Sequence, residues 1–273
     1  MTARRAVLLV AVLAASGAGC LRQRVDATAA ARAALTSVAY VRRSFQSSLA
    51  GCTNPASSAP TPCVRIDVEY VEATRATVEL ARAVAGFVAE TVLRPAGDGP
   101  PAPSVEALRD ELYERYQERQ RAFPDYHVPW RLERTVTVAC NTPRAQGLVA
   151  ADRSFTGGAS GIDRVDYRSF DTLSGARIGV DALVAPEQRS AFIDEIERRF
   201  REARRLAPGQ SLTGAGFTFP GGRFAATDNL LVCPDVLTFR WNRGEVAPDV
   251  FGPTEVVVPR AEVGGLLRAS ASL

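Results

Sequence analysis

The stretch VRIDVEYVEATRATVELARAVAGFVAETVL, residues 64–93, changes its hydrophobic period part-way along. Its first seven residues alternate apolar side chains with charged ones, which is the pattern of a half-buried β-strand. From Ala73 to Leu93 the apolar side chains instead recur at the spacing of one helix face. We therefore expect a strand that leads directly into a helix packed on its sheet.

The segments on either side continue this mixture. Residues 40–49 favour a strand, and the break RPAGDGPPAP separates the first helix from a second one. The second helix is expected to begin after Ser104 as its N-cap, with Leu108, Leu112 and Tyr116 on one face. Short β-runs follow at 132–140, 147–155, 164–170 and 177–180.

The last third of the chain repeats the combination of helix and strands. Residues 186–206 place Phe192, Ile196 and Phe200 on one helix face and charges on the other. Further strands are expected at 223–226, 230–233, 236–241 and 254–259. The pattern predicts an α+β fold of antiparallel β-sheets packed with helices. We expect two α+β subdomains, residues 38–160 and residues 161–268.

Composition is that of an ordinary globular protein, with 46% apolar and 23% charged residues. The net charge of +3 is spread without a block of like charge, which gives no indication of nucleic-acid binding. All 33 basic residues are arginine, and we interpret this as coding bias rather than mechanism.

The N-terminus has the features of an export signal. MTARR supplies two arginines, and AVLLVAVLAASGAG supplies an apolar run too short to span a membrane as a helix. The small residues 17–19 before Cys20 resemble the lipobox of bacterial lipoproteins, although Gly17 stands where leucine is usual. We expect residues 1–19 to be removed, Cys20 to carry the lipid and residues 20–37 to form a tether. The alternative is ordinary secretion with an unmodified Cys20.

The residue after the cysteine bears on the membrane to which the protein is sorted. It is Leu21 rather than the aspartate of the usual inner-membrane retention signal. This is compatible with anchoring at the periplasmic face of the outer membrane.

Four cysteines remain besides Cys20, an even number that favours disulfides in an exported chain. Four cysteines allow three pairings. Cys52 and Cys63 bracket the turn-rich loop TNPASSAPTP, whereas Cys140 and Cys233 both lie in strand-like runs. We expect the pairs Cys52–Cys63 and Cys140–Cys233. No metal or cofactor site is expected, because no cysteines are closely spaced and the chain has a single histidine.

Sequence signatures of catalysis are absent. The chain has no GxSxG, HExxH or P-loop motif and no deacetylase metal triad. A serine nucleophile would need a histidine base, and His127 in DYHVPW is the only histidine. Four carboxylates near expected strand ends are weak candidates for glycan cleavage, namely Glu69, Asp171, Asp181 and Glu255. We therefore predict a protein that is not an enzyme.

Four stretches occur in the order of a known family. They are RIDVEY with the Ala-rich helix after it, FTGGASG at 155–161, DYRSFDTLSGARIGVDALV at 166–184, and NLLVCPDVLTFRWNRGEVAPDVFGPTEVVVPRAEV at 229–263. The ordered set resembles the extracellular domain shared by RsiV-type lysozyme-sensing anti-sigma factors, by the region preceding the catalytic domain of PdaC-type peptidoglycan deacetylases, and by many uncharacterised bacterial lipoproteins. The resemblance covers about residues 38–268 and implies a PdaC-like N-terminal and an RsiV-like C-terminal subdomain.

The resemblance implies a role for the loop EVAPDVFGP before the last strand. In the family this loop lies on an exposed surface and is implicated in lysozyme contact, which implies a partner-binding role for Pro248, Asp249 and Phe251. Asp249 stands where the family has tyrosine. The structural alternative is that the prolines and glycine set the geometry of the loop while Phe251 packs inward.

The glycine motif FTGGASG is expected to form a turn. Gly157 and Gly158 are free to adopt positive φ and are interpreted as turn residues rather than ligand contacts. Ser160 stands where the family has histidine.

These observations predict a lipid-anchored periplasmic protein of the cell envelope whose domain binds another macromolecule, with lysozyme-like muramidases as the expected partner. The alternative is a module that binds peptidoglycan glycan, for which we expect a groove lined by Trp130, Trp241 or tyrosines. A cell-wall hydrolase is a more remote alternative. Transmembrane signalling is not expected, because the sigma-binding segment and membrane helix of the anti-sigma members are not recognisable.

Overall fold

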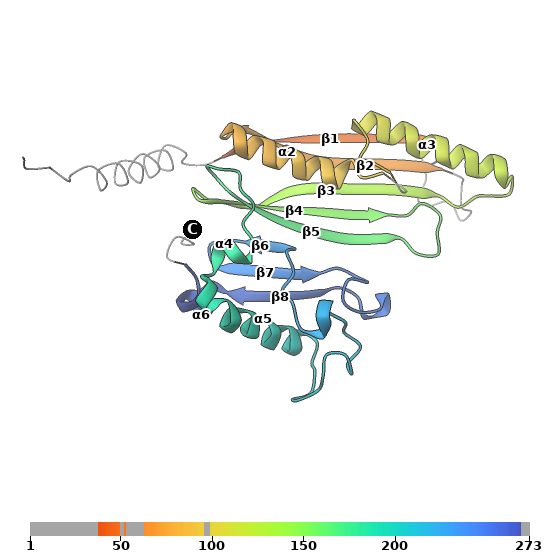
Figure 1. Ribbon diagram of the computed structural model, residues 1–273. Coiled ribbons are helices and arrows are strands. Elements are labelled where there is room, and N and C mark those ends of the chain that lie inside the picture. Colours follow the sequence, from red (N-terminus) through yellow and green to blue (C-terminus); the bar gives the residue numbers. More distant parts are fainter. Residues whose placement is uncertain (1–37, 50–51, 53–62, 96–98, 269–273) are drawn as a thin grey trace, which may run out of the picture.

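A computed structural model describes residues 38–49, 52, 63–95 and 99–268. The expected signal peptide and tether, with Cys20, lie outside these residues. Two sheets are present, one of five strands and one of three, and helices pack on each (Figure 1). The predicted α+β fold is therefore confirmed.

The first sheet has the strand order β1-β2-β3-β4-β5. Neighbouring strands are antiparallel except β2 and β3, which are parallel because two helices form the crossover between them. Its strands are β1 (Ala39–Leu49), β2 (Val64–Arg75), β3 (Trp130–Asn141), β4 (Ala145–Ser154) and β5 (Ile162–Asp171).

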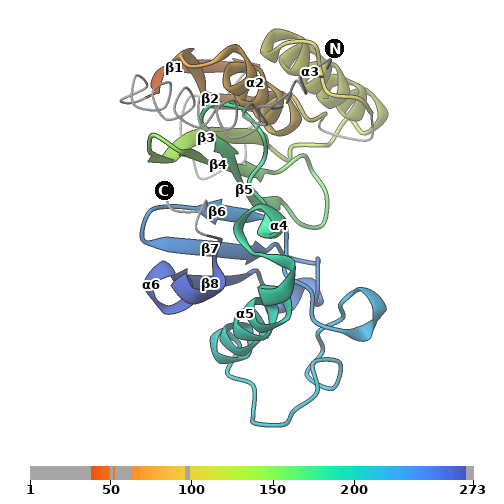
Figure 2. The same ribbon diagram turned by 60° about the vertical axis from the view of Figure 1, so that its left-hand side comes forward.

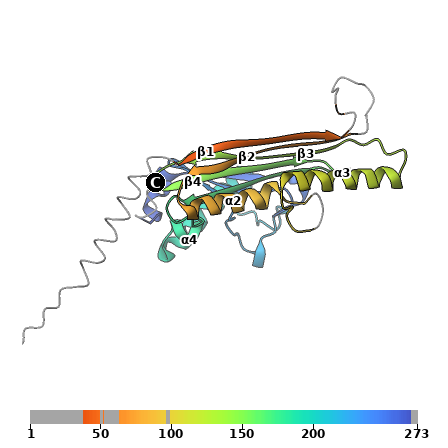
Figure 3. The ribbon, with the colours of Figure 1, turned by 90° about the horizontal axis from the view of Figure 1, so that it is seen from above.

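Helices α2 (Val78–Val92) and α3 (Val105–Ala122) cover one face of this sheet (Figure 3). The second begins where predicted, with the Ser104 hydroxyl accepting a hydrogen bond from the Ala107 amide. The first begins later than predicted: Ala73 pairs with Tyr40 of β1, and Thr77 is the N-cap. Strand pairing therefore overrides the helix propensity of this alanine-rich segment.

The second sheet has the order β6-β7-β8 and carries α5 on its face. The segments are α4 (Val180–Leu183), η1 (Pro186–Gln188), α5 (Arg189–Ala203), η2 (Pro220–Gly222), β6 (Leu230–Val232), β7 (Val236–Trp241), η3 (Asp249–Phe251), β8 (Thr254–Pro259), α6 (Arg260–Val263) and η4 (Gly264–Leu266). The predicted face of α5 is buried in the core of this unit.

Two short runs predicted as strands, 177–180 and 223–226, adopt other structures. Arg177 forms only an isolated bridge with Phe170, and Val180 already begins α4. Phe224 packs its ring 5.5 Å from that of Phe200 and 5.7 Å from that of Trp241. Its apolar character therefore reflects aromatic packing rather than a strand.

The two sheets meet edge to edge, with β6 beside β5 (Figures 1 and 2). Asn229 and Asn242 extend side-chain amides to the backbone of β5. The Asn229 Nδ2 donates to the Val165 carbonyl at 2.8 Å, and the Asn242 Oδ1 accepts from the Val165 amide at 3.0 Å. These amides take the place of a neighbouring strand, so the edge of β5 is satisfied here without a ladder.

The subdomain boundary predicted at residues 160 and 161 does not coincide with the change of sheet. Strand β5 pairs with β4 along its whole length and belongs to the first sheet. Phe170 lies in the first hydrophobic core, and Val180 is the first residue of the second core. The change of sheet therefore falls after Asp171.

Both predicted disulfides are present and confirmed. Cys52–Cys63 joins the two ends of the β1–β2 connection, with α-carbons 5.2 Å apart. Cys140–Cys233 joins β3 to the residue that follows β6, with α-carbons 5.6 Å apart, and so links the two sheets covalently.

Candidate binding loop

The connection between β7 and β8, residues 242–253, projects an apolar side chain into solvent. Val250 is 90% exposed, the most exposed of the large apolar side chains in the described segments. It lies within the short helix η3, between Asp249 and Phe251. Phe251 is 40% exposed. This is the loop that the sequence identified, although Val250 itself was not singled out.

Proline and glycine set the path of this loop. Pro248 precedes η3 in an extended conformation, and Gly252 follows it with a φ of 67° that favours glycine. Gly244 also has a positive φ of 78°, and a Cβ placed there would lie 2.7 Å from the Asp249 Oδ1. The geometric role expected of Pro248 and Gly252 is therefore present.

Arg204, at the C-cap of α5, forms hydrogen bonds with the C-terminal end of the loop. Its guanidinium donates to the Thr254 hydroxyl at 2.7 Å and to the carbonyls of Phe251 and Gly252 at 2.9 and 3.0 Å. It also lies 5.3 Å from the centre of the Phe217 ring. Burial lowers the pKa of Arg204 from its ordinary value. Because that ordinary value lies far above neutral pH, the side chain still carries its positive charge. Hydrogen bonds from one cation therefore hold the backbone carbonyls of Phe251 and Gly252 and the side chain of Thr254.

Phe251 is partly packed and partly exposed. Its ring packs edge-on against Phe217, with centroids 5.5 Å apart, and Phe217 in turn packs against the buried Phe200. Part of the ring therefore anchors the loop on the aromatic core, and the remainder stays exposed beside Val250. Asp249 is exposed and forms no ion pair within the described residues.

The glycine turn joins β4 to β5, at the same right-hand end of the molecule in Figure 1 as the β7–β8 loop. Gly157 has a φ of 80°, as expected, and packs against the Tyr126 hydroxyl and Trp130 Nε1. Gly158 lies in the same bend, but its φ lies outside the positive range. Ser160 is exposed.

The two tryptophans proposed for a glycan groove are both buried. Trp130 is 5% exposed and donates its Nε1–H to the Tyr126 hydroxyl at 2.8 Å. Trp241 is 3% exposed and packs among the phenylalanine rings of the second core. Neither ring can stack on a sugar in this conformation.

The carboxylates considered for glycan cleavage lie on separate elements. Glu69 pairs with Arg42, and Asp181 pairs with Arg189. Asp171 accepts backbone hydrogen bonds in the turn that follows β5. Glu255 accepts a 2.6 Å hydrogen bond from Tyr167, and burial together with this bond raises the pKa of Tyr167 to about 12. Each carboxylate therefore has a structural partner, and they do not form one site.

Metal sites and membrane-spanning helices can be considered for the described part of the chain. There, no group of three histidine, cysteine, aspartate or glutamate side chains is arranged to hold a metal ion. No helix in that part is both long and apolar enough to cross a membrane. His127 is exposed, between α3 and β3.

Sequence reasoning missed Arg204, which lies 50 residues before Thr254 in the chain. No local pattern distinguishes it from the other arginines of α5. Val250 could have been identified, because it is an apolar residue in a loop bounded by Pro248 and Gly252.

Comparison with known proteins identifies a family match for part of the chain and two solved structures with a similar fold. Residues 181–261 match a family described as "Protein of unknown function (DUF3298)". No curated protein matches the chain. A DUF3298 family protein from Pseudomonas aeruginosa has a TM-score of 0.60 and one from Bacteroides fragilis a TM-score of 0.59, each at 15% sequence identity. In both cases the match covers 86% of this chain and 96% of the other chain. The C-terminal unit thus carries a DUF3298 domain, and the chain shares the overall fold of these two proteins.

Proposed function

We propose that this protein is anchored in the bacterial cell envelope by a lipid on Cys20, and that its folded part binds a protein partner through residues 248–251. The observation that carries the proposal is the 90% exposure of Val250 on a backbone held by Arg204. Because the loop is already ordered, a partner that covers Val250 would not have to pay again for fixing the backbone.

The proposed partner is a lysozyme-like muramidase. The support for this choice is the resemblance of EVAPDVFGP to the lysozyme-contacting loop of RsiV-type proteins. Muramidases of the hen type are basic, and the exposed carboxylate of Asp249 beside Val250 complements a basic surface. The proposed role is binding without catalysis.

The test is binding of the purified protein, with both disulfides formed, to hen-type lysozyme, with insoluble peptidoglycan as a parallel sample. We expect saturable lysozyme binding that weakens about fivefold or more in Val250→Ser, because an anchor residue contributes more than about 1 kcal/mol. Asp249→Ala should weaken binding mainly at low salt. Val78→Ser is the matched control, because Val78 is exposed on α2 in the other unit.

The possible results separate the candidate functions. Lysozyme binding that is equal in Val250→Ser and Val78→Ser would remove the loop from the interface. Retention on peptidoglycan without lysozyme binding would favour the glycan-binding alternative. The lipid anchor is tested separately: Cys20→Ala should move the protein from the membrane fraction to the soluble fraction.

A further inference from the structure

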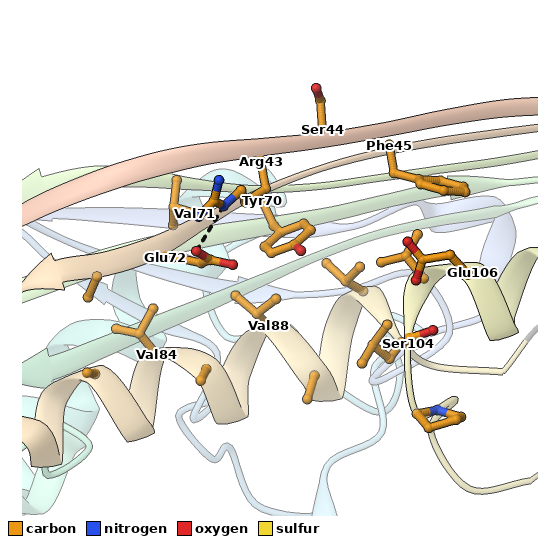
Figure 4. A pocket seen from close by; sticks show the side chains of 18 residues that line it. Arg43, Ser44, Phe45, Tyr70, Val71, Glu72, Val84, Val88, Ser104 and Glu106 are labelled. Atoms are coloured by element: carbon orange, nitrogen blue, oxygen red, sulfur yellow. Dashed lines mark hydrogen bonds and ion pairs between the residues drawn. The ribbon is translucent and has the colours of Figure 1, made fainter.

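A cavity of about 650 Å³ lies in the first unit, between the sheet and α2 (Figure 4). Its walls come from β1, β2, α2 and the segment that begins α3. The volume lies within the range of about 300–1,000 Å³ that is typical of small-molecule sites. The cavity belongs to the first sheet, whereas the β7–β8 loop belongs to the second, so this site is separate from the proposed partner-binding loop.

Short side chains on α2 create the cavity. Ala81, Ala85 and Ala89 form one row at four-residue spacing, and Val84, Val88 and Val92 form the row beside it. Helix α2 packs over β2 to β5, and α3 packs over β1 and β2. The space between the two helices and β1 is therefore filled only in part, and its lining is mainly aliphatic, with the Phe45 ring at one end (Figure 4).

Polar groups lie at two places on the rim. Arg43 and Glu72 form an ion pair, with Nε and Oε2 2.9 Å apart, so their charges neutralise one another. Ser104 and Glu106 lie at the other end, beside Phe45, and Tyr70 lies between the two polar places (Figure 4). Glu106 forms no ion pair within the described chain. The guanidinium of Arg109 lies over the Phe45 ring at this end, but it is paired with Asp110 at 2.7 Å, so Glu106 leaves the rim with a net negative charge.

The start of α3 does not make this end of the cavity an anion site. A helix N-terminus favours negative charge, but here Glu106 supplies that charge. Hydrogen bonds from its own backbone amide and from the Ser104 side chain lower the pKa of the Glu106 carboxyl, so it is ionised at neutral pH. A second carboxylate or phosphate would be repelled, and Arg43 is already engaged by Glu72.

We propose that this cavity binds an amphipathic amine, with its aliphatic chain along the α2 valines and its protonated amino group beside Glu106 and the Tyr70 hydroxyl. The aliphatic lining selects the chain, because burying it removes apolar surface from water. The negative charge of Glu106 selects the head group.

The test uses dodecylamine as the probe, with dodecanol and dodecanoate of equal chain length for comparison. Binding to the purified protein is measured by isothermal titration calorimetry below the micelle concentration of each probe. Ala85→Trp fills the cavity from a helix position that is exposed at the surface, so the fold should be retained. Val78→Trp places the same side chain on the same helix outside the cavity lining. Glu106→Gln removes the charge and leaves the apolar walls unchanged.

We expect dodecylamine to bind one molecule per chain, and Ala85→Trp to weaken it about tenfold or more while Val78→Trp does not. Glu106→Gln should weaken dodecylamine about two- to fivefold at low salt and leave dodecanol unchanged, because the carboxylate is exposed. Three results would overturn the proposal: no saturable binding, equal affinity in Ala85→Trp and the unmodified protein, or dodecanoate binding as tightly as dodecylamine. Circular dichroism of each variant establishes that it is folded.

Discussion

At the residue scale, Gly157 is the position where a single methyl group should have the largest effect on the β4–β5 turn. Its φ is 80°, and a Cβ would lie 1.8 Å from the Tyr126 hydroxyl oxygen and 2.5 Å from Trp130 Nε1. Gly157→Ala must therefore displace two side chains that are hydrogen-bonded to each other. We expect the free energy of unfolding, measured by urea denaturation, to fall by about 2–3 kcal/mol.

The neighbouring glycine is the control for this effect. Gly158 lacks a positive φ, and a Cβ there would meet its nearest atom at 3.6 Å, an ordinary contact. Gly158→Ala should change the free energy of unfolding by less than about 0.5 kcal/mol. Equal losses in the two variants would show that the turn does not depend on the conformation of Gly157.

Arg204 is the second residue whose removal has a specific expected result. Arg204→Lys keeps the positive charge but cannot reproduce three hydrogen bonds from one planar group. We expect a loss of about 1–3 kcal/mol in the free energy of unfolding and faster proteolysis within residues 242–253. Arg205→Lys, at the exposed next position, should do neither. A variant loop as resistant to protease as the unmodified one would contradict the role of Arg204.

The loop could be identified from the sequence, but the hydrogen bonds from Arg204 that stabilise it could not. Pro248, Asp249 and Phe251 follow from a local motif, but the packing of Phe251 was open until the fold placed Phe217 against it. Arg204 contacts Thr254, 50 residues later in the chain, and no hydrophobic or helical periodicity indicates such a contact. The same limit applies to Arg134, whose buried ion pair with Asp152 lies between strands that the sequence showed only as separate β-runs.

At the scale of the element, α5 carries an ion-pair cluster that should make the protein sensitive to acid. Glu195 lies between Arg198 and Arg199, each with a guanidinium nitrogen 2.6 Å from its Oε1. Hydrogen bonding, first from Arg198, lowers the pKa of Glu195 to about 2. An unfolded glutamate has a pKa of about 4.3. The unfolded state therefore binds more protons between these values, and stability from this group is complete above about pH 5 and lost as the pH falls toward 2.

Glu195→Gln should remove that contribution. We expect the variant to be less stable by about 0.5–1 kcal/mol at pH 7, since solvent screens the exposed Arg198, and the difference to disappear near pH 2. Urea denaturation at pH 7, 4 and 2 measures it. Asp194→Asn on the same helix is the control, because Asp194 forms no ion pair within the described chain. A difference that persists unchanged at pH 2 would mean that packing, rather than charge, explains the loss.

The ends of helices and strands could be predicted where a local residue, such as an N-cap, sets them. Ser104 fixes the start of α3, because its hydroxyl replaces an absent backbone partner. The start of α2 was misplaced, because β1 pairs with residues as far as Arg75 and that pairing is not visible in the sequence of β2 alone. The run 223–226 was misassigned for a similar reason, since a short apolar segment fits a strand or an aromatic cluster equally well.

At the scale of the whole molecule, the arrangement of the sheets could be predicted only in class. The residues of β5 predict a strand but do not show which strand it pairs with, so the predicted boundary grouped it with the C-terminal subdomain, whereas it pairs with β4. Side chains of Asn229 and Asn242 then satisfy its outer edge. An asparagine at the end of a strand is also typical of a turn. Its role in hydrogen-bonding the edge of another strand is therefore recognisable only once the fold is known.

The junction between the sheets gives the last prediction. The Cys140–Cys233 bond spans 93 residues, whereas Cys52–Cys63 spans 11. In the chain-entropy description, the longer loop stabilises more, and replacing both members of each pair by alanine should cost about 2 kcal/mol more for the longer loop. Denaturation of the two double variants under identical conditions measures this difference.

Asn229→Ala tests whether the disulfide and the amide contacts act as one junction. Removing Asn229 leaves the Val165 carbonyl without this partner at the edge of β5, which should cost about 1–3 kcal/mol when the disulfide is intact. If the disulfide holds β6 against β5, the same change should cost less once Cys140 and Cys233 are replaced, because the contact is then already weakened. Strictly additive losses would show instead that β6 stays in place without the bond, and that the disulfide acts only on the unfolded chain.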